Sequence, residues 1–391
     1  MKNSANADTS LRRITNGPKF HWFGYYDKLQ FDPSCRFVLG MEVDFEHRSP
    51  TENDVIKIGM VDLEDDDCWI ELGETRAWCW QQGCMLQWRP GSNDEILWND
   101  FDGDHFVCHI KNVNTGEERT FPHAIYTVSA DGKTAVAPDF RRIQDMRPGY
   151  GYPGLPDPCV NELAPADSGI YRLNLETGDC EEIISIAQVV EIPNPNFELS
   201  DAKHYFNHLL FNTDGSRFIF LHRCRASQSG FHTRMMTAAP DGSDIRVVDD
   251  FGRTSHFIWR DTEHILAWSW HPSKEDKFYL YKDGTREVEV VGEDKMLANG
   301  HCTYLPDTEW VLNDTYPMGE HRTQSLYLYH VPTDRKIPLG DFPSPEPYQG
   351  EWRCDLHPRF SPDGKSVVID SAHEGSGRQM YLIDVSELLV S

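Results

Sequence analysis

Four histidines occupy the same place in a sequence unit that recurs along the chain. Each lies three residues before an aromatic residue that leads into a turn motif, and they are His208, His256, His301 and His357. Imidazole binds transition metals and accepts a proton near neutral pH. Because equivalent positions of a closed repeat array face a common axis, we expect these side chains to share one site for a divalent metal or for proton abstraction.

A structural explanation of this pattern is the alternative, since duplication could have copied a histidine that only satisfies backbone groups. The first three units argue against it, because their equivalent positions hold Lys28, Met85 and Ile125. A histidine that the scaffold required would have been kept in every unit. His123 lies two residues before Ile125 and so projects from the same face of a strand, which makes it a fifth candidate for the site.

Two further segments carry polar side chains that could reach a ligand. In HWFGYYDK, Tyr26 and Lys28 enter an inner strand whose two faces are normally apolar, which indicates a pocket wall. In DFRRIQDMRPGYGYPG the candidates are Arg142, Arg147, Tyr150 and Tyr152. Guanidinium groups bind carboxylates through paired hydrogen bonds, and tyrosine rings can stack on sugar faces. An ordinary surface loop with solvated arginines is the alternative for this second segment.

The elements that must position these residues are short hairpins. Seven copies of one unit place Pro-Asp-Gly, or a degenerate form of it, between two runs of alternating apolar residues, as in HPRFSPDGKSVVID. Pro-Asp-Gly favours a tight turn, and a period of two favours strands. A further strand-like run follows each copy, and the turns fall at residues 33, 90, 130, 213, 261, 306 and 362. This spacing is near the ~40–50 residues of a four-stranded propeller blade.

The repeat therefore predicts an all-β fold, a seven-bladed β-propeller of four-stranded antiparallel blades that occupies residues 1–391 as a single domain. One long interval holds an insertion, residues 141–166, which we expect to lie over the funnel. The last unit has only three strands, so we expect residues 11–15 to pair with it. That pairing would close the ring and remove a free sheet edge.

Composition excludes several classes of protein. Lys+Arg number 37 against 63 for Asp+Glu, a net charge of −26 that disfavours binding to nucleic acid or to an anionic membrane. No apolar run approaches the ~18 residues of a spanning helix. The first residues lack the apolar core of a signal peptide, so we expect a cytoplasmic protein, or a periplasmic or secreted one if a leader was removed. Nucleotide-binding, serine-hydrolase and zinc-protease motifs are absent.

At these segments the sequence resembles the oligogalacturonate lyases, seven-bladed propellers that split short uronide chains by β-elimination. HWFGYYDKLQFDPSCRFVLG is similar to the opening strand of that family, and SHFIW to the segment of its catalytic histidine, here His256. TRMMTAAPDGSDIRVV resembles the segment with the arginine that binds the substrate carboxylate, here Arg234. GHCTYLPD and LHPRFSPDG resemble two metal-ligand segments, which the likeness assigns to His301 and His357.

Two departures from the family pattern affect the expected ligands and substrate. In WRCDLHP, Trp352 stands where the family has a metal-binding Gln, and Asp355 stands where it has a further His. Asp355 can still ligate, because carboxylate suits Mn²⁺. The insertion is more similar to the propeller ulvan lyases, so we expect a different uronide as substrate.

The resemblance and the residues together predict a lyase that cleaves uronic-acid-containing oligo- or polysaccharide with the help of a divalent metal. Mn²⁺ is the expected ion, with Zn²⁺ or Ca²⁺ as alternatives. The expected catalytic groups are His256 as base, Arg234 as carboxylate clamp, His208 as proton donor or fourth ligand, and Tyr150 or Tyr152 as acid to the leaving oxygen. The expected metal ligands are His301, Asp355 and His357. The expected substrate-binding residues are Lys28, Tyr26, His123, Arg142, Arg147 and Tyr152.

Two other functions remain open on sequence. A propeller glycoside hydrolase needs a placed carboxylate pair or a histidine acid, and the carboxylates that could supply it are Asp27, Asp102, Asp314 and Asp370. A non-catalytic propeller that binds a protein partner would need neither a metal nor the histidines. The identity of the sugar, its sulfation and the oligomeric state are also open.

Overall fold

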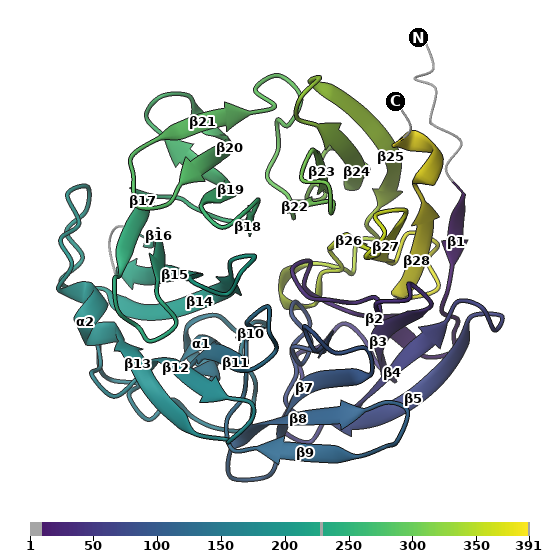
Figure 1. Cartoon of the computed structure of the whole chain (residues 1–391), viewed down its shortest axis with the longest axis horizontal. Helices are drawn as coiled ribbons and strands as arrows, with labels where there is room; N and C mark the ends of the chain where they lie inside the picture. The colour runs from purple at the N-terminus through teal and green to yellow at the C-terminus, as the bar shows by residue number, and fades with distance from the viewer. Residues whose placement is uncertain (1–9, 227–229, 390–391) are drawn as a thin grey trace.

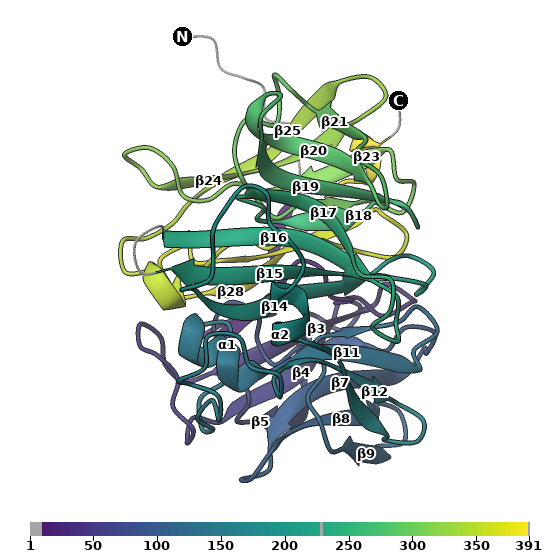
Figure 2. The ribbon, with the colours of Figure 1, turned by 90° about the vertical axis from the view of Figure 1, so that its left-hand side faces the viewer.

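Seven four-stranded antiparallel sheets surround one axis in the computed structural model, which describes residues 10–226 and 230–389 (Figure 1). The fold is the predicted seven-bladed β-propeller. Figure 2 shows the ring edge-on, with the strands running through its thickness. In the described part of the chain, no helix has the length and apolar character needed to cross a membrane.

In each blade, the strands follow one another along the chain from the channel outward, except that the outer strand of blade 7 comes from the N-terminal segment. Blade 1 is β2 (Phe20–Trp22), β3 (Phe37–Val43), β4 (Ile56–Asp62) and β5 (Cys68–Thr75). Blade 2 is β6 (Gln87–Trp88), β7 (Glu95–Phe101), β8 (Phe106–Asn112) and β9 (Glu118–Phe121). Blade 3 is β10 (Thr127–Val128), β11 (Thr134–Pro138), β12 (Gly169–Asn174) and β13 (Cys180–Ser185). Blade 4 is β14 (Lys203–Phe211), β15 (Phe218–Ala226), β16 (Gly230–Ala238) and β17 (Arg246–Gly252).

The remaining blades follow the same order. Blade 5 is β18 (Phe257–Trp259), β19 (His264–His271), β20 (Glu275–Lys282) and β21 (Val288–Val291). Blade 6 is β22 (Thr303–Tyr304), β23 (Trp310–Asn313), β24 (Thr323–His330) and β25 (Arg335–Pro343). Blade 7 is β26 (Arg359–Phe360), β27 (Ser366–Ser371), β28 (Gln379–Asp384) and β1 (Leu11–Arg13). The outer strand of blade 7 thus comes from the N-terminal segment, with Leu11 opposite Ile383 (Figure 1).

The core lies between the blades, because each middle strand is covered on both faces. β27 has five buried residues in six and β23 has all four buried, so these strands are covered on both faces. Between blades 1 and 2, Trp22, Trp78 and Trp80 pack at ring-centroid distances of 5.0–5.7 Å. Burial of such large side chains contributes about 25 cal/mol per Å² of apolar surface. The packed blades form a rigid ring around the channel.

The innermost strand of blade 1 is interrupted, and the interruption fills the channel. β2 pairs with the end of β3, where Trp22 lies opposite Met41, and the chain rejoins β3 only at Phe31, opposite Val38. Residues 23–29 therefore leave the sheet and cross the channel. The Asp370 carboxylate of β27 accepts the backbone N–H groups at residues 23 and 24, which fixes the start of this excursion.

Two short helices flank blade 3. In the insertion between β11 and β12, α1 (Phe140–Met146) begins after Asp139, whose side chain accepts the N–H of Arg141 as an N-cap. α2 (Ile186–Val190) follows β13 and begins after Ser185, whose hydroxyl accepts the N–H of Gln188. The first helix and the loop that follows it carry several residues into the central cavity.

Candidate functional site

Three of the four register-equivalent histidines pack together at the axis. The ring centroids of His256 and His301 are 4.2 Å apart, and those of His301 and His357 are also 4.2 Å apart. Tyr25, from the crossing segment of blade 1, stacks on His208 at 5.0 Å and meets the His357 ring edge-on at 5.4 Å. The structure thus brings all four predicted histidines to one site, with Tyr25 between His208 and the other three.

Backbone irregularities turn two of these histidines into the channel. His208 and His357 have φ angles of 51° and 42°, a left-handed region that is uncommon for residues other than glycine. In β14 the strand register shifts between Asn207 and Leu210, so the strand bulges at this position. Met85, the equivalent residue of blade 2, has a φ of 58°. A left-handed backbone conformation therefore recurs at this repeat position in blades 2, 4 and 7.

His301, Asp355 and His357 form a group that fits a metal ion. Their ligand atoms lie within 4.8 Å of one another, and all three side chains are buried. The Nε2 of His357 and one carboxylate oxygen of Asp355 are buried without a hydrogen-bond partner among the described residues, which is costly unless a ligand satisfies them. Burial and the neighbouring His301 lower the pKa of His357 well below its ordinary value, so the ring stays in the neutral form that coordinates metals.

A second carboxylate orients this group. Asp314 accepts the Nδ1–H of His301 at 2.9 Å and the backbone N–H groups of His301 and His357. The Nε2 of His301 is thereby left as the free ligand atom, an arrangement typical of metal-binding histidines. The indole N–H of Trp352 donates to a backbone carbonyl of the loop before it, so this residue takes no part in the group.

His256 is held in one tautomer by two residues that the sequence did not single out. Its Nδ1 lies 2.9 Å from the side-chain oxygen of Asn299, and the Tyr316 hydroxyl lies 3.2 Å from its Nε2. The Asn299 amide donates to Ser255, which leaves its oxygen to accept the Nδ1–H. Burial and the adjacent His301 lower the pKa of His256 well below its ordinary value. The ring is therefore neutral, with an Nε2 lone pair available to accept a proton.

A cavity of about 310 Å³ opens beside His256. It is lined by Arg147, Tyr150, His208, Arg223, Phe231, Thr233, Gly252, Arg253, Thr254, Ser255, His256, Trp268, Asp276, Asn299 and Tyr316. Among the described residues, neither Arg147 nor Arg223 has a carboxylate partner, and the Nε of Arg223 is buried without an acceptor. In a chain with a net charge of −26, two guanidinium groups without counter-charges indicate a built anion site.

Tyr150 connects the two cavity arginines to the metal-competent group, which is the set His301, Asp355 and His357. The Arg147 guanidinium lies 4.1 Å from the centre of its ring, and Arg353 donates to its hydroxyl at 2.6 Å while also donating to Asp355. Although burial opposes it, the charges of Arg147 and Arg353 lower the pKa of Tyr150 below its ordinary value. Since both arginines donate to the phenol oxygen, the phenol proton is free to be given to a ligand.

Arg234 is not part of the cavity, contrary to its predicted place as the carboxylate clamp. It lies on β16 beside Thr233, which does line the cavity, and side chains of neighbouring strand residues point to opposite faces. Its guanidinium donates to His222 and to the carbonyl groups of Val189 and Ile192. The arginine that faces the cavity from this hairpin is Arg223, which no sequence motif marks.

Three other residues predicted to bind substrate lie outside the cavity beside His256. Arg142 is 1% exposed, pairs with Asp157 at 3.0 Å and donates to four backbone carbonyls, so it anchors the insertion. Tyr152 is fully buried, stacked 4.3 Å from Phe140. His123 lines a different pocket, near the start of the insertion. The first two are engaged by the protein, and neither lines the cavity beside His256.

The residues of the crossing segment lie at the channel but are engaged by the protein. The Tyr26 hydroxyl exchanges hydrogen bonds with the backbone N–H and carbonyl of Phe257, which ties blade 1 to blade 5. Lys28 pairs with Asp27 at 2.7 Å. His208 is also engaged, since Gln82 approaches its Nδ1 and the hydroxyl of Tyr25 approaches its Nε2. These groups shape the floor of the site.

The carboxylates considered for hydrolysis do not form a pair in the cavity. Asp314 orients His301, Asp370 binds Arg359 at 2.8 Å, and Asp27 pairs with Lys28. Asp102 accepts backbone N–H groups of its own turn. Asp276, the one carboxylate that lines the described cavity, lies 3.3 Å from Arg253.

The fold and this site define a seven-bladed propeller with a histidine- and arginine-lined central cavity. No protein-family model matches the sequence, and no curated protein matches it. The structure is similar to an oligogalacturonate lyase from Vibrio parahaemolyticus, with a TM-score of 0.70 and 16% identity over 98% of this chain and 96% of that one. It is similar to an oligogalacturonate lyase in complex with manganese, with a TM-score of 0.68 and 16% identity over 97% and 95% of the two chains.

Other propellers are similar over most of this chain. The tricorn protease has a TM-score of 0.53 and 11% identity, over 95% of this chain and 35% of its own. The expected likeness to oligogalacturonate lyases is therefore confirmed at the level of the fold. At these identities the comparisons establish architecture, and the chemistry must be argued from the cavity itself.

Proposed function

We propose that this protein is a carbohydrate lyase that cleaves a uronic-acid-containing oligosaccharide by β-elimination. The observation that carries the proposal is the convergence of two kinds of group in one cavity: guanidinium groups with no carboxylate partner among the described residues, and a neutral histidine whose Nε2 meets the exchangeable hydroxyl of Tyr316. The first suit the carboxylate of a uronate, and the second suits removal of the weakly acidic proton beside it. The manganese complex of a structurally similar lyase supports the same class.

Arg223 takes the role of carboxylate clamp, with Arg147 beside it. Both line the cavity on the side of His256, and neither has a carboxylate partner among the described residues. Negative charge develops on the substrate carboxylate as the adjacent proton leaves, so fixed positive charges there lower the barrier. Because the site is buried, these charges act more strongly than they would in water.

A divalent metal, Mn²⁺ by analogy with the structurally similar lyase, would be held by His301, Asp355 and His357. When bound, it supplies further positive charge for the uronate carboxylate. The chain prepares this position through Asp314, which keeps the Nε2 of His301 free to ligate.

His256 removes the proton at C5 of the uronate through Nε2. The electron pair of that C–H bond forms the C4–C5 double bond, and the C4–O bond breaks. Tyr150 gives its phenol proton to the departing oxygen; afterwards His256 releases the abstracted proton to solvent and Tyr150 takes one up from solvent. Substrate would displace the Tyr316 hydroxyl from Nε2, while Asn299 keeps the proton on Nδ1.

The test is ultraviolet absorbance of the unsaturated uronate product. The native protein is incubated with oligogalacturonate, ulvan and rhamnose–glucuronate fragments, with and without chelator. We expect absorbance to rise on one of these substrates and to be lost in His256→Ala. His264→Ala is the matched control, since His264 belongs to the same blade but binds Asp261 at its turn. Sugar release without absorbance would replace the lyase with a hydrolase, and no reaction of either kind would leave a binding propeller.

A further inference from the structure

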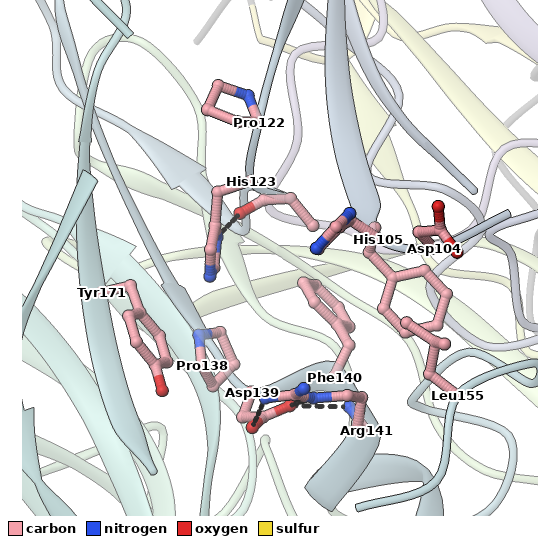
Figure 3. A pocket seen from close by; sticks show the side chains of 12 residues that line it. Asp104, His105, Pro122, His123, Pro138, Asp139, Phe140, Arg141, Leu155 and Tyr171 are labelled. Carbon is pink, nitrogen blue, oxygen red and sulfur yellow. Dashed lines mark hydrogen bonds and ion pairs between the residues drawn. The ribbon is translucent and has the colours of Figure 1, made fainter. Parts of the chain in front are cut away.

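A second pocket lies between blades 2 and 3, next to the insertion. It has a volume of about 220 Å³ and takes its walls from the β7–β8 turn, the segment before β10, β12 and the start of α1. Figure 3 shows its lining side chains, which are Asp104, His105, Phe106, Pro122, His123, Ala124, Pro138, Asp139, Phe140, Arg141, Leu155 and Tyr171. The same insertion supplies Tyr150 to the central cavity. One segment of chain therefore contributes to both sites.

The pocket combines an aromatic wall with a few hydrogen-bonding groups. The rings of His123 and Tyr171 pack with centroids 4.8 Å apart and form one side (Figure 3). Phe140 and Leu155 add apolar surface. The Nδ1–H of His123 donates to the carbonyl of Ala124 at 2.8 Å, which leaves Nε2 as an acceptor. Apolar walls with a small number of placed polar groups are typical of small-molecule sites.

The charge of this pocket differs from that of the central cavity. The Arg141 guanidinium is bound by both carboxylate oxygens of Asp139, at 2.9 and 2.8 Å, so its charge is balanced (Figure 3). Asp104 adds a carboxylate at the rim, and burial lowers the pKa of His123, which is therefore neutral. No cation in this pocket is left to bind an anion, whereas Arg147 and Arg223 provide two in the cavity.

We propose that the pocket between blades 2 and 3 binds an uncharged sugar ring. Its volume is below the ~300–1,000 Å³ of drug-sized sites, so it fits one ring. The aromatic wall suits the apolar face of a pyranose, and His123 together with the free N–H groups of Arg141 suits its hydroxyls. The identity of the ligand rests on the proposed carbohydrate function.

The experiment is saturation-transfer NMR on the full chain with single-ring probes. The probes are methyl glucoside and methyl rhamnoside as neutral rings, and methyl glucuronide as the charged counterpart. We expect transfer to the neutral glycosides in the native protein, at least a tenfold weaker effect in Tyr171→Ala, and no change in Arg172→Ala. Arg172 follows Tyr171 on β12, pairs with Glu181 and does not line the pocket, so it is a matched control.

The outcomes separate this proposal from the lyase proposal. If the native protein binds neutral glycosides but shows no elimination on any uronide, the pocket is supported and the lyase proposal is removed. Binding of the glycosides should persist in His256→Ala. Elimination without glycoside binding, or binding that is unchanged in Tyr171→Ala, would overturn the pocket. Preference for the glucuronide at this pocket would also overturn it. His123→Ala gives a second test, since it removes the acceptor without changing the Tyr171 ring.

Discussion

Each face of the β15–β16 hairpin carries a buried arginine, and the two arginines differ in how far the protein satisfies their hydrogen-bond donors. On the face toward α2, Arg234 donates to His222 and to two backbone carbonyls, and His222 in turn lies 2.9 Å from the Nδ1 of His204. On the face toward the cavity, Arg223 has a buried Nε without an acceptor. A cation of the first kind stabilises the fold, and a cation of the second kind is available to a ligand.

The difference teaches how to distinguish function from architecture in this molecule. Burying a charge costs free energy unless the charge is paired or hydrogen-bonded. A buried cation that the protein leaves unpaired is therefore expected where a ligand supplies the partner. The same criterion separates the metal-competent group, where His357 and Asp355 have atoms without partners, from Arg142, whose guanidinium is fully engaged.

Loss of the base has the largest effect. His256→Ala should lower kcat on the uronide substrate about 10³-fold or more, because general base catalysis contributes ~10²–10⁴-fold. Initial rates of product absorbance measure this, with the melting temperature as a control for folding. Retention of native activity in this variant would contradict the assignment of His256.

Arg223→Met should lower kcat/KM about 10²–10³-fold while leaving the unfolding free energy unchanged or higher. The substitution removes a positive charge that only the substrate carboxylate would neutralise. Kinetics and urea denaturation on the same preparation separate the two quantities. A large loss of stability would show that Arg223 has a structural role and would weaken the comparison.

Arg234→Met is the reciprocal experiment. It should cost about 3 kcal/mol of unfolding free energy, because His222 and the carbonyls of Val189 and Ile192 lose their donor in a buried place. Activity per folded molecule should change little. If instead kcat/KM fell and stability were unchanged, the arginine expected from the sequence resemblance would be the clamp after all.

Mn²⁺ at 100 times its dissociation constant should stabilise the native protein by about 2.7 kcal/mol, since only the folded state assembles the ligands. Thermal denaturation with and without Mn²⁺ measures the shift, and calorimetry measures binding directly. His357→Ala should abolish both, while His321→Ala, an exposed histidine outside the site, should respond as the native protein does. Binding that survives in His357→Ala would remove the proposed ligand set.

The smallest expected effect is on the pH dependence of stability, and it comes from a buried carboxylate that has no cationic partner among the described residues. Asp249 accepts from Thr254 at 2.6 Å, and burial raises its pKa to about 6. A raised pKa means that the folded state binds the proton more tightly, so this contribution is present below pH ~4 and is lost as pH rises through 6. Asp249→Asn should therefore remove about 1–2 kcal/mol of the decline in stability between these pH values. Identical pH profiles for the two proteins would contradict this.

The blades and the four site histidines, His208 among them, could be predicted because they depend on local sequence. Pro-Asp-Gly turns and alternating strands are decided by residues that are neighbours in the chain, and the repeat carries the four histidines to equivalent positions. Arg223 was missed because it lies eleven residues before the expected Arg234, on the partner strand, and which face each presents depends on the register of the hairpin. Tyr316 and Asn299 lie in loops with no motif to mark them.

The amino-acid sequence by itself determined the number of blades, the ring of histidines and the acidic charge that disfavours nucleic acid. Only the tertiary structure decided which polar groups are satisfied by the protein and which are left for a ligand. The physical reason is that hydrogen bonding in a propeller core joins residues far apart in the chain, as Asp314 joins His301 to His357 and Arg353 joins Tyr150 to Asp355. Local sequence predicts strands and turns, but only the packed blades determine where an unsatisfied charge remains.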